Sequence, residues 1–234
     1  MRKKKRYRFK KAFIKSIERS TMDKMIALTN KDYLSECLNV EPLKEGDKLF
    51  VESEDMSDSF LNRSKNNNEI VMPNAYINTA LWMLDIIKSS HDNLVKDSYI
   101  FSSLYCFRHY LELIMKDSIH YFKLNRGEIS PTETGYVKER HSLTKLWNTL
   151  NSYLDSENDV KIVGKLIEEL DELDEGSTSF RYAFNQTKEG IIVEYDYPTT
   201  IIDVSELKIR MLQLFRFFEG INSFARDCPE IETY

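Results

Sequence analysis

Side chains able to do acid–base or anion-binding chemistry gather in one stretch of the sequence, between Phe107 and Lys116. Arg108 offers a guanidinium that matches phosphate oxygens, and His109 offers a proton carrier for neutral pH. Glu112 and Lys116 follow Arg108 at successive intervals of four residues, which puts all three on one face of a helix. The residue types and their spacing indicate anion binding or proton transfer.

The segment that must carry these groups has the periodicity of one long helix, at about residues 98–122. Its hydrophobic side chains fill one broad arc, and Arg108 and Glu112 fall inside that arc, with His109, Lys116 and His120 at its margin. A buried ion is costly unless a partner compensates it. Two interpretations follow: an internal Arg108–Glu112 ion pair that fixes the helix register, or a polar pocket that presents Arg108 to an anion.

The elements around this helix are also expected to be mainly helical. Apolar spacing predicts helices over residues 73–90, 142–154, 160–174 and 203–226, and the last opens with a capping box, Asp203 to Glu206. The β-branched and aromatic run 190–197 predicts a strand that pairs with residues 180–184, and Leu49–Val51 predicts another short strand. The expected fold is mainly α: an up-and-down bundle of four to five helices, with a short β-hairpin insertion and a smaller N-terminal segment.

Three regions are expected along the chain: a basic arm over residues 1–15, a small segment over 16–70 with short helices, a strand and a loop, and the bundle over 71–234. The arm concentrates positive charge in a chain whose net charge is -5. Such a block suits phosphate backbones. The expected nucleic-acid contacts are Arg2, Lys3, Lys4, Lys5, Arg6 and Arg8. The alternatives are a solvated arm or one that folds onto the acidic body.

Acidic residues crowd the C-terminal end of the helix at 160–174, where the helix dipole favours positive charge. A basic partner is therefore expected, from Arg181, Arg108 or the basic arm. The acidic run has no fixed metal-ligand spacing, so neither a metal nor a cofactor is predicted.

Cysteine spacing, apolar runs and signature motifs exclude several classes of protein. The three cysteines form no CxxC pair, no apolar run approaches the length of a membrane span, and no secretory segment follows the basic N-terminus. A cytoplasmic protein without a membrane contact is expected. The sequence also lacks the phosphate-loop, dinucleotide-binding, zinc-protease and hydrolase-elbow motifs.

Three segments together carry a resemblance to a known family: Phe107-Arg-His-Tyr-Leu-Glu-Leu113, His141-Ser-Leu-Thr-Lys-Leu-Trp147, and Asp174-Glu-Gly-Ser-Thr-Ser-Phe-Arg-Tyr182. In their order and spacing, over roughly residues 74–226, they resemble a largely uncharacterised bacterial branch of the HEPN superfamily. Members of that superfamily are helical bundles common in phage-defence and toxin–antitoxin systems. Its catalytic members are metal-independent ribonucleases with an Arg followed four to six residues later by His. This chain departs from that pattern, because Arg108 is followed at once by His109 and next by His120.

The resemblance implies a protein that binds RNA or a nucleotide, and leaves open whether it is an enzyme. If it cleaves RNA, attack by the ribose 2′-hydroxyl without a metal is expected. The catalytic candidates are Arg108 as phosphate clamp, His109 or His141 as acid or base, and Arg181 stabilising developing charge. The candidates for substrate binding are Glu112, Lys116, Asp174, Ser177 and Tyr182. A homodimer and an antitoxin or defence-system partner are also expected.

An alternative, in which the cluster is structural, stands beside this interpretation. The same side chains can form a buried polar network of Arg108, Glu112, His141, Asp174 and Arg181 that ties helices together. The protein would then be a non-catalytic interaction protein that dimerises or binds a protein partner, with the basic arm as a nucleic-acid tether.

Overall fold

The computed structural model describes residues 41, 43–50, 59, 68–130, 132–133, 141–155, 158–174, 179–181, 184–186, 192–194 and 201–227. The basic arm and most of the segment expected at 16–70 lie outside these residues. The chain divides into two compact units, Met1–Arg63 with Ser90–Asp97, and Ser64–Ser89 with Ser98–Tyr234. The second unit holds the candidate site. The predicted division into arm, segment and bundle stays a prediction.

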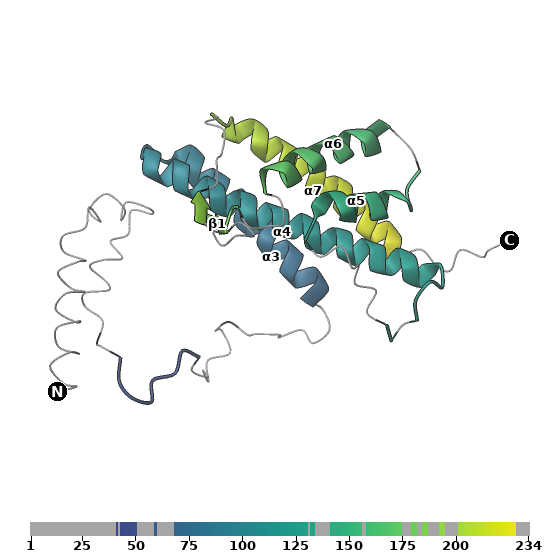
Figure 1. Ribbon diagram of the computed structural model, residues 1–234, viewed down its shortest axis with the longest axis horizontal. Coiled ribbons are helices and arrows are strands. Elements are labelled where there is room, and N and C mark those ends of the chain that lie inside the picture. Colours follow the sequence, from purple (N-terminus) through teal and green to yellow (C-terminus); the bar gives the residue numbers. More distant parts are fainter. Residues whose placement is uncertain are drawn as a thin grey trace. The chain divides into compact units, whose positions relative to one another are not determined.

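The described residues are mainly α-helical, as predicted. Five helices are present among them: α3 (Asn68–Ser89), α4 (Asn93–Asn125), α5 (Leu143–Asn151), α6 (Asn158–Leu173) and α7 (Val204–Asp227) (Figure 1). Two short strands, β1 (Phe184–Gln186) and β2 (Ile192–Glu194), pair antiparallel with Phe184 opposite Glu194. Strand β2 lies inside the predicted run 190–197, whereas β1 begins where the predicted partner strand ended.

One hydrophobic core joins the helices of the second unit. On α3, the side chains of Ile77, Ala80, Leu84 and Ile87 are buried at helical spacing. On α4, six of the predicted arc positions are buried: Leu104, Phe107, Leu111, Ile114, Met115 and Ile119. Ile100 and Tyr105 are half-buried, and Phe101 is exposed. The predicted apolar faces therefore do form the core.

Local sequence signals explain where helices α7 and α5 begin. The Asp203 side chain accepts hydrogen bonds from the backbone N–H groups of Ser205 and Glu206, at 2.9 and 3.1 Å, as the capping pattern predicted. Ser142 caps α5 in the same way by accepting from Lys145 N at 3.3 Å. Helix α3 begins at Asn68, earlier than predicted, and includes Pro73 in its second turn. A proline at this position removes the hydrogen bond to the carbonyl of Glu69, and its ring crowds that carbonyl.

One prediction about the N-terminal half was wrong. Leu49 and Phe50 lie in bends with exposed side chains and are not part of a strand, and Val51 lies outside the described residues. The segment Glu69–Ser89 of α3 is long and apolar enough to cross a membrane by composition alone, with a hydropathy of 1.2. Its charges are confined to Glu69, Asp85 and Lys88, and the stretch between Glu69 and Asp85 is shorter than the roughly 20 residues of a membrane span. Core helices of soluble proteins pass the same test, and absence of a membrane contact stays a prediction.

The helices form a bundle whose strict up-and-down order fails between α4 and α5. The N-terminus of α5 lies beside Arg108, because Arg108 Nη2 donates to the carbonyl of His141 at 2.6 Å. Beyond the other end of α5, Tyr153 stacks on Phe122 near the end of α4, with ring centroids 5.3 Å apart. Helices α4 and α5 therefore run in the same direction. The connection from residue 126 to 142 therefore brings the chain back to the level of Arg108 before α5 begins, whereas the up-and-down prediction placed α5 antiparallel to α4.

Candidate functional site

The Arg108 guanidinium lies at the centre of the candidate site and is completely buried, with a side-chain exposure of 0%. Its Nη2 donates to Asp171 Oδ1 at 3.0 Å, in addition to the His141 carbonyl. Its Nε lies 3.3 Å from Asp174 Oδ2, and its Nη1 lies 3.6 Å from Glu112 Oε2. One cation thus faces three carboxylates, supplied by α4 and by the C-terminal end of α6.

Asp171 joins three helices through one carboxylate. Besides Arg108, it accepts hydrogen bonds from the backbone N–H groups of Leu143 and Thr144, at 3.1 and 3.0 Å, and from Ser142 Oγ at 3.1 Å. These are the unpaired donors at the start of α5, which favour negative charge. Burial alone would raise the pKa of Asp171, but the hydrogen bonds from Thr144, Leu143 and Ser142 outweigh it and lower that pKa.

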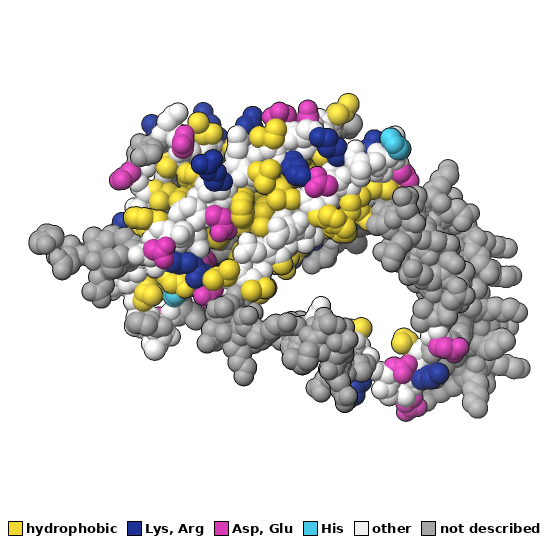
Figure 2. Space-filling model, turned by 180° about the vertical axis from the view of Figure 1, so that it is seen from behind, with side chains coloured by type: hydrophobic (Ala, Val, Ile, Leu, Met, Phe, Trp, Pro, Cys, Tyr) yellow, Lys and Arg dark blue, Asp and Glu magenta, His cyan; other side chains and the backbone are white. Residues whose placement is uncertain are grey.

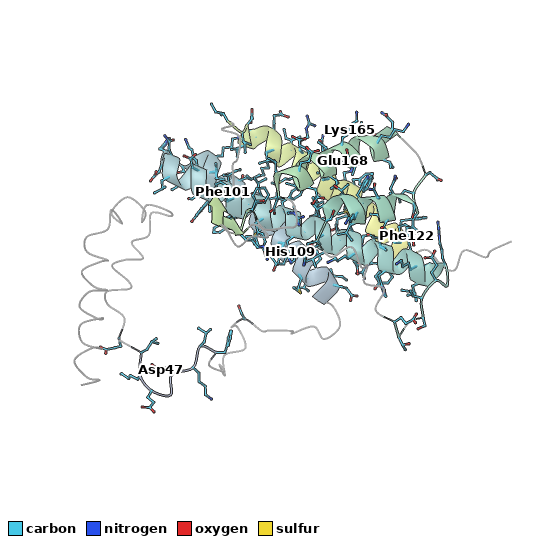
Figure 3. All side chains as sticks on the ribbon, in the orientation of Figure 1. Asp47, Phe101, His109, Phe122, Lys165 and Glu168 are labelled. Atoms are coloured by element: carbon cyan, nitrogen blue, oxygen red, sulfur yellow. The ribbon has the colours of Figure 1, made fainter. Side chains whose placement is uncertain are left out.

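Asp174 binds Ser179, which follows it by five residues. Its Oδ1 accepts from Ser179 N at 2.6 Å and from Ser179 Oγ at 2.8 Å, while its Oδ2 faces Arg108. The acidic end of α6 was expected to need a positive charge. Arg108 supplies it for Asp171 and Asp174. Glu168, Glu169 and Glu172 on the same helix are exposed, and Figure 3 labels Glu168 and Lys165 on α6.

Glu112 connects the buried cluster to the surface. Its Oε1 accepts from Lys116 Nζ at 2.6 Å and lies 2.9 Å from His141 Nδ1, while its Oε2 faces Arg108. Burial would raise the pKa of this carboxyl, but the hydrogen bonds and charges of Lys116 and His141 outweigh it and lower that pKa. Glu112 is therefore ionised at neutral pH.

His141 lies at the outer edge of this cluster, with a side-chain exposure of 57%. A carboxylate beside Nδ1 favours the tautomer in which Nδ1 carries the proton. The lone pair then resides on Nε2, the nitrogen that accepts a proton in general base catalysis. His141 thus has a fixed ring orientation together with solvent access.

His109 belongs to an aromatic group next to the cluster. Its ring meets Tyr76 of α3 edge-on at 4.4 Å and stacks on Tyr105 at 6.1 Å, and Figure 3 labels it on α4. Burial is the main cause of its lowered pKa, which keeps the imidazole neutral at pH 7. Arg181 is exposed, and its guanidinium carbon lies 5.9 Å from the Tyr105 ring. A strip of four side chains therefore lies beside the buried ions: Tyr76, Tyr105, His109 and Arg181.

Four buried polar atoms within the described residues have no well-aligned hydrogen bond: Arg108 Nε and Nη1, Glu112 Oε2 and Asp174 Oδ2. These are the atoms that face one another at 3.3 and 3.6 Å. Charge attraction, which depends less on angle than a hydrogen bond does, compensates them. The Arg108 guanidinium thus faces more acceptor oxygens than it can form well-aligned hydrogen bonds with.

The structure brings together Arg108, Glu112, Lys116, His141 and Asp174, and places His109 and Arg181 on the adjacent strip. Ser177, Tyr182 and the basic residues Arg2, Lys3, Lys4, Lys5, Arg6 and Arg8 lie outside the described residues. Sequence reasoning missed Asp171 and Ser179 as members of the cluster. Asp171 could have been found, because it lies one turn before Asp174 on the same helix.

No group of three or more His, Cys, Asp or Glu side chains suited to hold a metal ion occurs in the part of the chain that the structure describes. Comparisons of the chain with protein-family models, with curated proteins and with solved structures found no match.

Proposed function

We propose that this protein is a HEPN-like helical bundle that binds RNA or a nucleotide and cleaves RNA without a metal, with His141 as general base. One observation carries the proposal: a half-exposed imidazole whose Nδ1 lies 2.9 Å from a buried, ionised carboxylate. A carboxylate that orients a histidine in this way is a recurring device for proton transfer. The strip around His109 supplies rings for contact with a base.

The role first considered for Arg108 changes in this proposal. A phosphate clamp must reach its ligand, whereas the Arg108 side chain has no exposed surface and faces three carboxylates. Arg108 is therefore proposed as a positioning residue, which holds Glu112 and the carbonyl of His141 in place. Lys116, which is partly exposed, and Arg181 are proposed to neutralise the substrate phosphate.

The proposed step is transfer of the phosphate to the ribose 2′-oxygen. Nε2 of His141 takes the proton of the 2′-hydroxyl, and the 2′-oxygen forms a bond to phosphorus. The bond from phosphorus to the 5′-oxygen breaks, and that oxygen takes a proton from solvent while the imidazolium returns its proton to solvent. The products are a 2′,3′-cyclic phosphate and a 5′-hydroxyl.

The test compares His141→Asn with wild type and with His91→Asn, an exposed histidine outside this site. The Asn amide can still donate to Glu112, so the structural bond is kept, but no titratable nitrogen remains. Single-stranded RNA is incubated with each protein in a chelator, and the product ends are identified. We expect cyclic phosphate ends from wild type and His91→Asn, and a loss of at least a hundredfold in His141→Asn with an unchanged melting temperature.

The outcomes separate binding from cleavage. If wild type retains RNA but does not cleave it, the protein is an RNA-binding protein and His141 has no catalytic role. RNA that is neither retained nor cleaved would refute the proposal and favour the non-catalytic interaction protein. Action in phage defence or a toxin–antitoxin pair, an antitoxin-like partner and a cytoplasmic location are proposed on the resemblance alone.

A further inference from the structure

His141 is held at its main chain as well as at its ring. Its carbonyl accepts a hydrogen bond from Arg108 Nη2 at 2.6 Å, and its Nδ1 lies 2.9 Å from Glu112 Oε1. In the sequence it directly precedes Ser142, the N-cap residue of α5. Whether the ring meets Glu112 thus depends on where the start of α5 lies.

The Asp171 carboxylate accepts four hydrogen bonds, and all of them come from groups that hold His141. The donors are Ser142 Oγ at 3.1 Å and Thr144 N at 3.0 Å to Oδ2, and Leu143 N at 3.1 Å and Arg108 Nη2 at 3.0 Å to Oδ1. Three donors belong to the residues that follow His141 in the chain. The fourth is the same Nη2 atom that binds the His141 carbonyl.

The four donors require a carboxylate at position 171. Each carboxylate oxygen takes two of them, so both oxygens must be acceptors. An asparagine side chain has one acceptor oxygen, and its NH₂ group can only donate. Asp171→Asn would therefore point a donor at one of the two pairs of donors. The start of α5, the Arg108 guanidinium or both would have to move.

Burial prevents water from taking over these contacts. On the face of the helical body that Figure 2 shows, acidic and basic side chains lie scattered among hydrophobic ones, and water can replace a lost partner there. Asp171 is only 9% exposed and Arg108 is fully buried. A donor that loses its partner at such a site stays unsatisfied unless the main chain moves. The position of the His141 main chain is therefore tied to the Asp171 carboxylate.

We propose that Asp171 is a positioning residue for His141. It holds the start of α5 and the Arg108 guanidinium so that the imidazole Nδ1 meets Glu112, and it acts through the main chain without touching substrate. The catalytic consequence rests on the proposed function. The structural consequence is a single fixed tautomer of His141, with the proton on Nδ1, and it is measured without RNA.

The experiment records long-range proton–nitrogen NMR spectra of the full chain, which show the ring nitrogen that carries the proton in each of the four histidines. Mildly alkaline pH keeps the imidazoles neutral, and the signals lost in His141→Asn identify His141. We expect the Nδ1–H tautomer alone in wild type and a mixture of both tautomers in Asp171→Asn. Glu172→Gln, an exposed position next to Asp171 on α6, is the matched control and should give the wild-type spectrum.

Cleavage of single-stranded RNA gives a second readout. Asp171→Asn should lower kcat by at least about tenfold and change KM by less than about twofold, because a misplaced base slows the chemical step while the phosphate contacts remain. Absence of cleavage by wild type would refute the proposed function, and the NMR spectra then decide the positioning role alone.

The spectra are compared only among proteins that circular dichroism shows to be folded. A folded Asp171→Asn that keeps the Nδ1–H tautomer alone would overturn the proposal, and so would a mixture of tautomers in wild type. If Asp171→Asn does not fold, Ser142→Ala decides, because it removes one of the four donors and keeps the carboxylate. A second tautomer of His141 in Ser142→Ala supports the positioning role, and a single tautomer overturns it.

Discussion

Replacing Arg108 by Met tests whether the buried cluster holds the helices together. The variant keeps the length of the side chain and removes the guanidinium, so three carboxylates lose the cation that they share. Of the three carboxylates, Glu112 alone retains a second Lys or Arg partner among the described residues, Lys116 at 2.6 Å, whereas Asp171 and Asp174 keep only hydrogen bonds. Removing one partner of a buried ion network costs about 3–5 kcal/mol, because the remaining charges stay desolvated.

The expected loss is large enough to measure by two methods. Urea unfolding followed by circular dichroism should show a free energy of unfolding about 4 kcal/mol lower than that of wild type. For a chain of 234 residues this corresponds to a melting temperature lower by roughly 10 °C. Arg210→Met is the matched control, because Arg210 pairs with Glu206 at 3.5 Å on the exposed side of α7. It should change stability by no more than about 0.5 kcal/mol.

A double-mutant cycle with Asp174→Asn then isolates the pair. Since Arg108 and Asp174 face each other at 3.3 Å with both side chains buried, the double variant should lose about 1–3 kcal/mol less than the sum of the two single losses. A loss below about 1 kcal/mol in Arg108→Met would refute the structural role. Arg108 would then again be a candidate for direct contact with phosphate.

Two further predictions concern single positions. Because the pKa of Glu112 is lowered in the folded protein, its stabilising contribution is complete above the ordinary Glu pKa of about 4.3 and is lost as pH falls through the folded value. The gap in melting temperature between wild type and Glu112→Gln should thus persist from about pH 7 to 5 and shrink below about pH 4; a gap that does not shrink in acid would contradict this. Gly164→Ala places a methyl group 2.8 Å from Trp147 Nε1 and should cost about 1–3 kcal/mol in chemical unfolding. Gly220→Ala, with nothing within 4 Å, should be neutral or stabilising, and equal effects of the two would show that the Trp147 contact is unimportant.

The sequence predicted those features that depend on neighbouring residues along a helix. The spacing of apolar residues located the helices, and the same spacing showed that Arg108 and Glu112 face the core. The Asp203 cap was predictable for a similar reason, because its partners are two and three residues away.

Features that depend on distant residues could not be predicted in the same way. Asp171 lies 63 residues from Arg108, and only the packing of α6 against α4 shows that they meet. The shared direction of α4 and α5 depends on the path of the connection between them. The exposure of His141 depends on where that connection ends.

Asp171 also constrains how this chain can change over generations. Its carboxylate serves the start of α5 and Arg108 at once, and Arg108 in turn serves Asp174 and Glu112. Loss of Arg108 removes the cation that the carboxylates share, and loss of one carboxylate changes the charge that the others balance, so the effect of each change depends on what occupies the other positions. Replacement of Arg108 by an apolar residue should therefore be tolerated only together with neutral residues at 171 and 174. We therefore expect these four positions to vary together among related sequences.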